Sequence, residues 1–289
     1  MISAEILKGA PAAAALCEKL SARAAALAER GITPCLCTLR VGERPDDVSY
    51  EGAARRRCEK LGIEFRSVVL GEDAAPELIA SAIDGMNADP AVHGILMFRP
   101  LPRPLRPFEP ELCERISPDK DVDGVTLGSM GRLYAGKEAF YPCTAQAVME
   151  LLGFYGVPLC GKKAVIVGRS LVIGRPVAML LMHANATVTI THSHTEGIEE
   201  LCRDADLIVA AARHTGIVTT GLLHPGQTVI DVGVILDEET QRIRGCVDQP
   251  DAERIVARIS PVPGGVGSVT TSVLAAHVIE AAERQIGEF

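Results

Sequence analysis

The hydrophobic and polar positions of the first hundred residues alternate between extended and helical patterns. Three apolar runs predict strands and the stretches between them predict helices: strands at 35–42, 64–70 and 92–98, and helices at 48–61 and 76–87. An Ala- and Leu-rich stretch over residues 4–30 predicts a first helix that ends before a glycine. This rhythm predicts a parallel sheet covered by helices, with ligands bound at the carboxyl ends of the strands.

A proline-rich segment separates this region from a second one with the same alternation. Residues 99–110 predict a largely irregular loop and residues 117–124 a turn. The pattern then predicts helices at 144–156 and 174–185 and strands at 163–168, 187–191, 207–212 and 228–234. A glycine-rich break at 263–267 precedes a last helix over 269–286. The 289 residues therefore predict two α/β domains of ordinary size.

Composition narrows the class of protein. A hydrophobic content of 47% supports packed cores, and a formal net charge of −8 argues against a nucleic-acid-binding protein. The run Arg55-Arg56-Arg57 is typical of a solvated helix face. No apolar segment is long enough to span a bilayer, and the first residues lack the pattern of a signal peptide. We therefore expect a cytoplasmic protein.

Cysteine usage does not predict a disulfide framework. The nine cysteines are odd in number and irregularly spaced. Cys35 and Cys37 fall in an apolar run, where a strand would point both thiols to one face. No further Cys or His follows at the spacing of metal ligands, so we expect buried, reduced thiols.

The segment "VIVGRSLVIGRP" (165–176) predicts a strand, a glycine turn and the start of a helix. Gly168 and Gly174 would let the backbone approach a phosphate, and the helix N-terminus would supply N–H donors. A turn that needs glycine only for its own backbone is the alternative. Arg169 follows the strand, where an arginine can meet the 2′-phosphate of NADP.

The segment "THSHT" (191–195) ends the next strand, at the position that faces the adenosine ribose in a dinucleotide fold. Ser193 could donate a hydrogen bond to a 2′-phosphate. His192 and His194 resemble a pair of metal ligands, but no third ligand is apparent in the sequence. A histidine that packs, or that lies beside the cofactor, is the favoured interpretation of His192, and no metal is predicted.

Five segments of the chain follow one another in an order that resembles a known family: "PDKDVDG", "PCTAQAVMELL", "GRSLVIGRPVAMLL", "NATVTITHSHT" and "PVPGGVGSVTT". They are similar to signature segments of the methylenetetrahydrofolate dehydrogenase/cyclohydrolase family (FolD). The family's usual reactions oxidise 5,10-methylenetetrahydrofolate to the methenyl form with NADP and then hydrolyse it to 10-formyltetrahydrofolate.

The resemblance also implies an architecture. It implies two α/β domains with a cleft between them, and a homodimer, which we expect to form through the middle domain. Residues 1–140 and 268–289 would form the folate-binding catalytic domain, an α/β substrate domain. Residues 141–267 would form a Rossmann-like NAD(P)-binding domain. Strands 187–191 and 207–212 are apolar, and one of them could lie at a sheet edge that pairs with the second copy.

Individual site residues follow from the same resemblance. Tyr50 takes the position of the family's folate-side tyrosine, and Asp123 that of the aspartate that binds the pterin. A carboxylate suits the pterin amine and ring N–H, although on its own Asp123 could equally be a turn aspartate. On the substrate side the loop of Pro263, Gly264 and Gly265 would line the same cleft. On the cofactor side the matching positions are Gly168, Arg169, Ser170, Ser193 and Val234.

The chain departs from the family pattern at two catalytic positions. The pattern Y-x-x-x-K places a proton-carrying lysine one helical turn after the tyrosine, where this chain has Ala54. The pattern "G-I-L-V-Q-L-P-L-P" reads "GILMFRPLP" here, with Phe98 in place of the supporting glutamine and Arg99 after it. Hydride transfer depends mainly on positioning, whereas hydrolysis needs acid/base catalysis. We therefore expect the dehydrogenase step to survive and the cyclohydrolase step to be weak or lost.

Other interpretations stay open at this stage. Arg55, Arg56 or Glu51 could assume the role of the lysine in an ordinary bifunctional enzyme, although a guanidinium does not deprotonate near neutral pH. The chain could be a non-catalytic relative, or it could act on a different pterin carrier if Phe98 and Arg99 reshape the pocket.

For the cofactor, NADP is favoured over NAD. Arg169 and Ser193 stand where a 2′-phosphate would lie, and no acidic residue is placed to bind the ribose hydroxyls. His194 occupies the position where the family usually has a basic residue.

Overall fold

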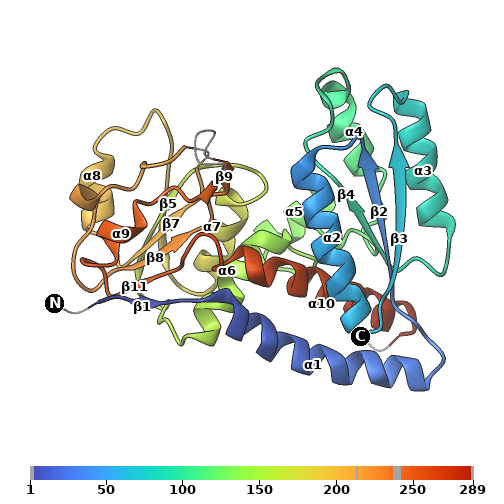
Figure 1. Cartoon of the computed structure of the whole chain (residues 1–289), viewed down its shortest axis with the longest axis horizontal. Helices are drawn as coiled ribbons and strands as arrows, with labels where there is room; N and C mark the ends of the chain where they lie inside the picture. The colour runs from blue at the N-terminus through green and yellow to red at the C-terminus, as the bar shows by residue number, and fades with distance from the viewer. Residues whose placement is uncertain (1–2, 213, 237–241, 288–289) are drawn as a thin grey trace. The chain divides into compact units, whose positions relative to one another are not determined.

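The computed structural model describes residues 3–212, 214–236 and 242–287, which form two compact α/β units (Figure 1). The small-sheet unit comprises Ala15–Cys143 and the described residues from Thr271 onward. The large-sheet unit comprises the described residues up to Ala14 together with Thr144–Thr270.

The small-sheet unit is built on three parallel strands in the order β3-β2-β4. The strands are β2 (Cys35–Val41), β3 (Glu64–Leu70) and β4 (Gly94–Met97), and the helices that follow β2 and β3 are α2 (Pro45–Lys60) and α3 (Pro76–Ala88). Strand β2 is buried along its whole length because it lies in the middle of the sheet. One hydrophobic cluster joins β2 and β4 to α3 and to the helix α4 (Glu109–Glu114).

Two helices of the small-sheet unit depart from the sequence-based prediction. Helix α2 begins at Pro45, three residues before the predicted start, because proline suits the first helical turn and Asp46 and Asp47 complement its dipole. The predicted loop over 99–110 contains a 3₁₀ helix, Arg103–Phe108, that leads into α4. Prolines stand in the first turn of both, where a missing N–H costs nothing. The remaining helices are α1 (Gly9–Glu29), α5 (Leu127–Tyr134) and α10 (Gly267–Gln285).

The large-sheet unit contains a six-stranded parallel sheet in the order β1-β11-β8-β7-β5-β6. Its strands are β1 (Glu5–Ile6), β5 (Lys163–Val167), β6 (Thr187–Thr191), β7 (Leu207–Ala210), β8 (Thr228–Asp231) and β11 (Arg258–Ile259). Its helices are α6 (Cys143–Phe154), α7 (Gly174–His183), α8 (Ile198–Arg203) and α9 (Gln249–Ala252), and a short antiparallel pair joins β9 (Ile235–Leu236) to β10 (Ile243–Arg244). This is the predicted Rossmann-like arrangement, with β6 at one edge.

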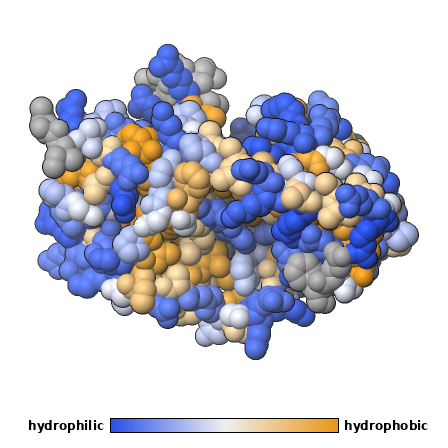
Figure 2. Space-filling model, turned by 90° about the horizontal axis from the view of Figure 1, so that it is seen from below, coloured by the Kyte–Doolittle hydropathy of each residue, from blue (hydrophilic) through white to orange (hydrophobic). Residues whose placement is uncertain are grey.

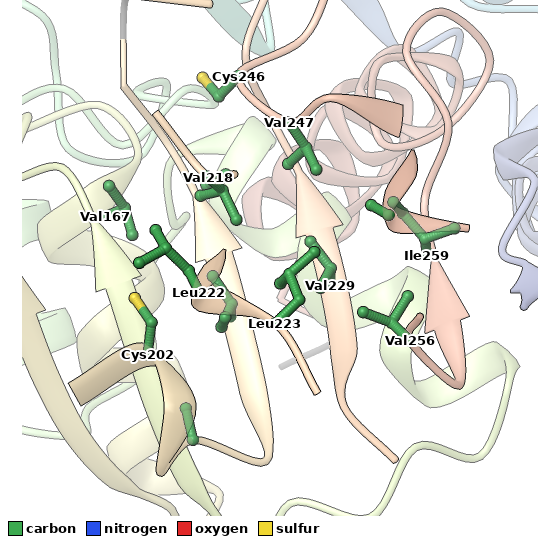
Figure 3. Close-up of a cluster of buried hydrophobic side chains, with 14 of the residues drawn as sticks. Val167, Cys202, Val218, Leu222, Leu223, Val229, Cys246, Val247, Val256 and Ile259 are labelled. Atoms are coloured by element: carbon green, nitrogen blue, oxygen red, sulfur yellow. The ribbon is translucent and has the colours of Figure 1, made fainter. Parts of the chain in front are cut away.

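The core of the large-sheet unit packs small aliphatic side chains against β5, β7, β8 and β11. Figure 3 shows this cluster, in which valines of the strands meet Leu222 and Leu223 from the connection before β8. The strands read as near-continuous apolar runs because a parallel sheet covered on both faces is buried on both faces.

The beginning of the chain differs from the prediction, which places residues 1–140 in one domain with a helix from residue 4. Instead Glu5 and Ile6 pair with Arg258 and Ile259 as the outer strand β1 of the large sheet. The N–H of Glu5 donates to the carbonyl of Ala257, and the N–H of Leu7 to that of Ile259. These backbone hydrogen bonds place the first residues in the large-sheet unit.

On the face shown in Figure 2, hydrophobic side chains gather in patches between hydrophilic ones. Within the described part of the chain, no helix is long and apolar enough to cross a membrane.

Candidate functional site

An aromatic pair marks the candidate substrate side of the small-sheet unit. Tyr50 stands half-buried on α2, and Phe98 follows β4 with 7% of its surface exposed. The two rings meet edge to face, with centroids 6.1 Å apart and planes inclined at 80°. Ala54, one helical turn after Tyr50, is 1% exposed. The position that follows Tyr50 by one turn therefore holds only a buried methyl group.

Burial raises the pKa of Tyr50 well above its ordinary value, and the nearby Cys143 and Asp123 raise it further. The phenol consequently stays protonated at neutral pH. It can donate a hydrogen bond or pack against a ligand, but it cannot serve as a base there.

Asp123 lies in the same unit and is joined to Arg99. The distance from Arg99 Nη2 to Asp123 Oδ2 is 3.8 Å, and the two side chains are 17% and 23% exposed. The backbone N–H of Cys143 donates to Asp123 Oδ1 at 3.4 Å. Burial raises the pKa of Asp123, and the charge of Arg99 is the largest effect that opposes this rise. Arg99 thus favours the ionised carboxylate.

A buried cluster holds the backbone next to Asp123. His277 Nδ1 on α10 donates to the carbonyl oxygen of Val122 at 2.8 Å, and Cys143 Sγ contacts the same oxygen at 3.3 Å. Burial lowers the pKa of His277 and raises that of Cys143, so both side chains are uncharged at neutral pH. The cluster fixes where the Asp123 carboxylate stands.

Two of the three residues considered as replacements for the missing lysine, Glu51 and Arg55, have other partners, and the third, Arg56, is exposed. The Glu51 carboxylate accepts hydrogen bonds from Thr38 Oγ1 (2.6 Å), Ser67 Oγ (2.5 Å) and Arg40 Nε (3.1 Å). The Arg55 guanidinium lies 4.3 Å from the centroid of the Phe65 ring. Glu51 is therefore part of a buried network that ties α2 to β2 and β3.

The two glycines of the predicted phosphate turn are required by the turn itself. Gly168 follows β5 with φ of +126°, and a Cβ there would lie 2.4 Å from the carbonyl oxygen of Ala211. A Cβ on Gly174 would lie 2.3 Å from the carbonyl oxygen of Gly168. The turn between β5 and α7 thus has room for glycine alone at both positions.

Polar side chains stand beside this turn at the carboxyl ends of β5 and β6, which are neighbours in the sheet. Ser170 Oγ accepts hydrogen bonds from the N–H groups of Ile173 (3.1 Å) and Gly174 (3.4 Å) and so caps α7. Arg169 and Ser193 are exposed. Burial, followed by the charge of Arg169, lowers the pKa of His192, which places the guanidinium near that ring.

The other predicted residues of the large-sheet unit lie outside its helices and strands. Val234 follows β8 and is 72% exposed. Pro263 and Gly264 are exposed, and the carbonyl oxygen of Gly264 accepts a hydrogen bond from the N–H of Gly9 at 2.8 Å. Gly265 is buried, and a Cβ there would lie 2.4 Å from the carbonyl oxygen of Pro261. The start of α1 and this loop are therefore held together.

The structure thus brings Tyr50 close to Phe98 and Asp123 in the small-sheet unit. That these residues form one substrate side stays a prediction. His277 was not singled out from the sequence, where a lone histidine in an apolar helix gives no distinct signal.

Eight of the nine thiols agree with the sequence-based prediction of buried cysteines, whereas Cys160 is exposed. All nine are free, and Cys35 and Cys37 are buried in the sheet. Burial raises the pKa of Cys35 to about 12 and that of Cys37 to about 11. Across residues 3–212, 214–236 and 242–287, no group of three or more His, Cys, Asp or Glu side chains could hold a metal ion. His192 Nδ1 instead accepts the N–H of His194 at 3.1 Å.

Comparison with known proteins assigns the two halves of the chain. Residues 7–123 match the family model "Tetrahydrofolate dehydrogenase/cyclohydrolase, catalytic domain", and residues 142–286 match the NAD(P)-binding domain of the same family. The bifunctional protein FolD of Carboxydothermus hydrogenoformans is 46% identical over 282 residues, which cover 97% of this chain and 98% of that protein.

Solved structures give the same result. FolD from Campylobacter jejuni superposes with a TM-score of 0.94 at 35% identity, covering 98% of this chain and 99% of that one. FolD from Trypanosoma brucei, a complex with NADP and an inhibitor, gives 0.94 at 34% identity, covering 99% and 100%. The predicted fold class, two α/β domains of which one is Rossmann-like and binds NAD(P), is confirmed.

Proposed function

Because the chain belongs to the tetrahydrofolate dehydrogenase/cyclohydrolase family, we propose that it oxidises 5,10-methylenetetrahydrofolate with NADP while its cyclohydrolase step is weak or lost. The observation that carries the second part is the apolar surface beside Tyr50. Ala54 stands where the family pattern has its lysine, and Phe98, in contact with the Tyr50 ring, stands where the pattern has its glutamine.

The substrate side keeps the groups that hold a pterin. The Asp123 carboxylate can accept hydrogen bonds from the pterin amine and ring N–H, and Arg99 favours the ionised state that this requires. The Tyr50 and Phe98 rings offer an apolar wall against which a flat ligand can pack. Positioning of the reacting carbon, which is what hydride transfer needs most, is therefore retained.

The cofactor side fits a dinucleotide phosphate. The exposed side chains of Arg169, Ser170 and Ser193 offer hydroxyl and guanidinium donors at the carboxyl ends of β5 and β6. The first N–H groups of α7 are engaged within the chain, since the N–H of Gly174 donates to Ser170 Oγ and that of Arg175 to the Ser170 carbonyl oxygen. Bound NADP would supply the nicotinamide ring that accepts the hydride. An arginine paired with a 2′-phosphate favours NADP over NAD.

Hydrolysis makes a different demand. A water must lose a proton and a ring nitrogen must gain one, which is the work of a positioned acid/base group. The protonated phenol of Tyr50 and the methyl of Ala54 do not provide one. General acid/base catalysis is typically worth ~10²–10⁴-fold, so its loss would leave hydrolysis near the spontaneous rate.

The alternatives receive less support. Glu51 is engaged by Thr38, Ser67 and Arg40, and Arg55 stacks on Phe65, which argues against a bifunctional enzyme that uses either group as a replacement. A non-catalytic relative would have no need for both a pterin carboxylate and a dinucleotide turn. A different pterin carrier would show itself as a failure to oxidise the tetrahydrofolate substrate.

A homodimer in the cytoplasm completes the proposal. Strand β6 lies at the edge of the large sheet, whereas β7 is internal, so β6 is the strand that can pair with a second copy. Ile190 on β6 is 36% exposed. Sedimentation equilibrium at micromolar concentration should give twice the mass of the chain, and a monomer would argue against this assembly.

The decisive experiment compares both steps in the purified protein. Methenyltetrahydrofolate formation is followed from 5,10-methylenetetrahydrofolate with NADP and with NAD, and methenyl hydrolysis is followed separately with the spontaneous rate subtracted. We expect NADP-linked oxidation and little enzyme-dependent hydrolysis. Hydrolysis as fast as oxidation would refute the loss of the second step, and absence of oxidation would refute the dehydrogenase.

A further inference from the structure

Arg99 is a partly enclosed cation with unused hydrogen-bonding capacity. Its side chain is 17% exposed, and a guanidinium carries five N–H donors. Among the described residues it donates no hydrogen bond to another side chain or backbone group. Its charged neighbour within 4.0 Å is Asp123, whose Oδ2 lies 3.8 Å from Nη2 and so beyond hydrogen-bonding distance.

The backbone that leads into Arg99 is held by strand β2. The residue before it, Phe98, is buried, and its N–H donates to the carbonyl oxygen of Leu39 at 2.9 Å. In the ion pair of Arg99 with Asp123, the carboxylate is held from its other oxygen. Asp123 Oδ1 accepts a hydrogen bond from the Cys143 N–H, while Oδ2 faces Arg99. The Arg99 guanidinium and the Asp123 carboxylate therefore stand side by side. Arg99 directly follows Phe98, and Asp123 is near enough to Tyr50 to raise the pKa of its phenol.

We infer that Arg99 and Asp123 together read the polar edge of a 2-amino-4-oxopterin, with Arg99 donating to the 4-oxo oxygen. This edge presents an acceptor followed by two donors, the oxygen at position 4, the N3–H and the 2-amino group. Asp123 would accept from the two donors, which leaves the oxygen for the guanidinium. The inference rests on the proposed function, because it assumes that Asp123 binds the pterin.

The assignment makes Arg99 a specificity-determining residue. A 4-amino analogue carries a donor where the natural ligand carries an acceptor, and it would set an amino group against the guanidinium. Leaving a polar group of the site unpaired is what gives hydrogen-bonded sites their strong discrimination. The family pattern has leucine at this position, so the contact would be a property of this chain.

The test measures binding of tetrahydrofolate and of its 4-amino-4-deoxy analogue to the full chain by titration calorimetry. We expect the unmodified protein to bind tetrahydrofolate at least tenfold more tightly than the analogue. Arg99→Leu should weaken tetrahydrofolate binding by about 10–100-fold and leave the analogue unchanged or improved. Arg99→Lys, which keeps the charge but not the planar donor fork, should recover part of the preference.

Two controls separate a binding role from a structural one. Arg115→Leu removes an exposed arginine that pairs with Asp84 in the same unit, and it should leave both affinities unchanged. NADP affinity and the melting temperature report whether each variant is folded. If Arg99→Leu does not fold, Arg99→Met, with an unbranched stem, takes its place.

Each outcome decides the inference. An unmodified protein without preference for the oxo ligand, or an Arg99→Leu protein that weakens both ligands equally, would overturn it. Turnover is scored separately: a protein that shows the predicted binding pattern but does not oxidise methylenetetrahydrofolate would refute the proposed function and leave the role of Arg99 standing.

Discussion

Phe98 meets the ring of Tyr50 edge-on, with centroids 6.1 Å apart, at the carboxyl end of β4. This contact places an apolar ring where the family pattern has an amide that could orient an ammonium. A lysine introduced at the buried Ala54 position would lack that partner, and burial would lower its pKa. The two departures from the family pattern are thus coupled.

Restoring both residues should restore hydrolysis. We expect Ala54→Lys with Phe98→Gln to raise enzyme-dependent methenyl hydrolysis by about tenfold or more, because a hydrogen-bonded lysine can act as the missing acid/base group. Either single substitution should give a smaller increase. Ala54→Lys alone lacks the glutamine amide that would orient the ammonium, and Phe98→Gln alone supplies no acid/base group. Stopped-flow absorbance, corrected for the spontaneous rate, measures the gain, and equal rates for the double and single variants would contradict the coupling.

Removing the Glu51 charge should destabilise the small-sheet unit rather than change catalysis. Glu51→Gln leaves Arg40 without its ion-pair partner at a buried position, and we expect about 3 kcal/mol less free energy of unfolding at pH 7. Urea unfolding measures this loss. The control is Glu59→Gln, an exposed position of the same helix, which should stay within about 0.5 kcal/mol of the unmodified protein.

The same carboxylate gives a pH dependence of defined sign. Burial acts to raise the pKa of Glu51, but hydrogen bonds from Ser67, Thr38 and Arg40 outweigh it and lower the pKa below the ordinary 4.5. A carboxyl whose pKa is lowered by folding stabilises the protein above its unfolded pKa. This contribution should be lost as the pH falls below about 4.5, so the difference in unfolding free energy between the unmodified protein and Glu51→Gln should shrink there.

Cofactor preference should depend on Arg169. Arg169→Ala removes the guanidinium that we place against the 2′-phosphate, so kcat/KM for NADP should fall about 10–100-fold while kcat/KM for NAD changes little. Steady-state kinetics with both cofactors measures the shift. Lys163→Ala, at the opposite, amino end of β5, is the matched control, and an equal loss for both cofactors would contradict the assignment.

The turn between β5 and α7 should not accept a side chain. Gly168→Ala puts a Cβ 2.4 Å from the carbonyl oxygen of Ala211 at a φ of +126°, and we expect a loss of about 2–4 kcal/mol together with weaker NADP binding. Gly153→Ala, at a position of α6 with no atom within 4 Å of the new Cβ, should be neutral or slightly stabilising. Thermal unfolding and NADP titration measure the two effects. Equal melting temperatures and equal NADP affinities for the two variants would show that the turn accepts a side chain and would contradict the prediction.

The sequence predicted the repeating framework because hydrophobic periodicity decides it. Strands 64–70 and 187–191 have the predicted bounds, and the turn at Gly168 lies where the glycines indicated. The strand at Glu5–Ile6 was not predicted, because two residues are too few to show a hydrophobic periodicity and because their partner strand is distant in the sequence. The short helices after residue 100 were not predicted, because proline is as typical of a break as of a first helical turn.

The candidate site was predictable only where single residues match a pattern. Tyr50, Asp123 and the serines were named from short segments. The environment of Asp123 was not, because Arg99 and His277 come from segments far apart in the chain and meet only after folding. The sequence alone likewise could not show that the Glu51 carboxylate accepts hydrogen bonds from side chains of β2 and β3.

The pairing of β1 with β11 has a consequence for biosynthesis. Arg258 and Glu5 are 253 positions apart, yet the Arg258 guanidinium donates to the Glu5 carboxylate and their strands lie side by side. Strand β1 is therefore synthesised long before its partner β11, and pairing over such a separation slows folding. A fragment that begins at Thr144 would lack β1 and present the outer edge of β11 to other chains.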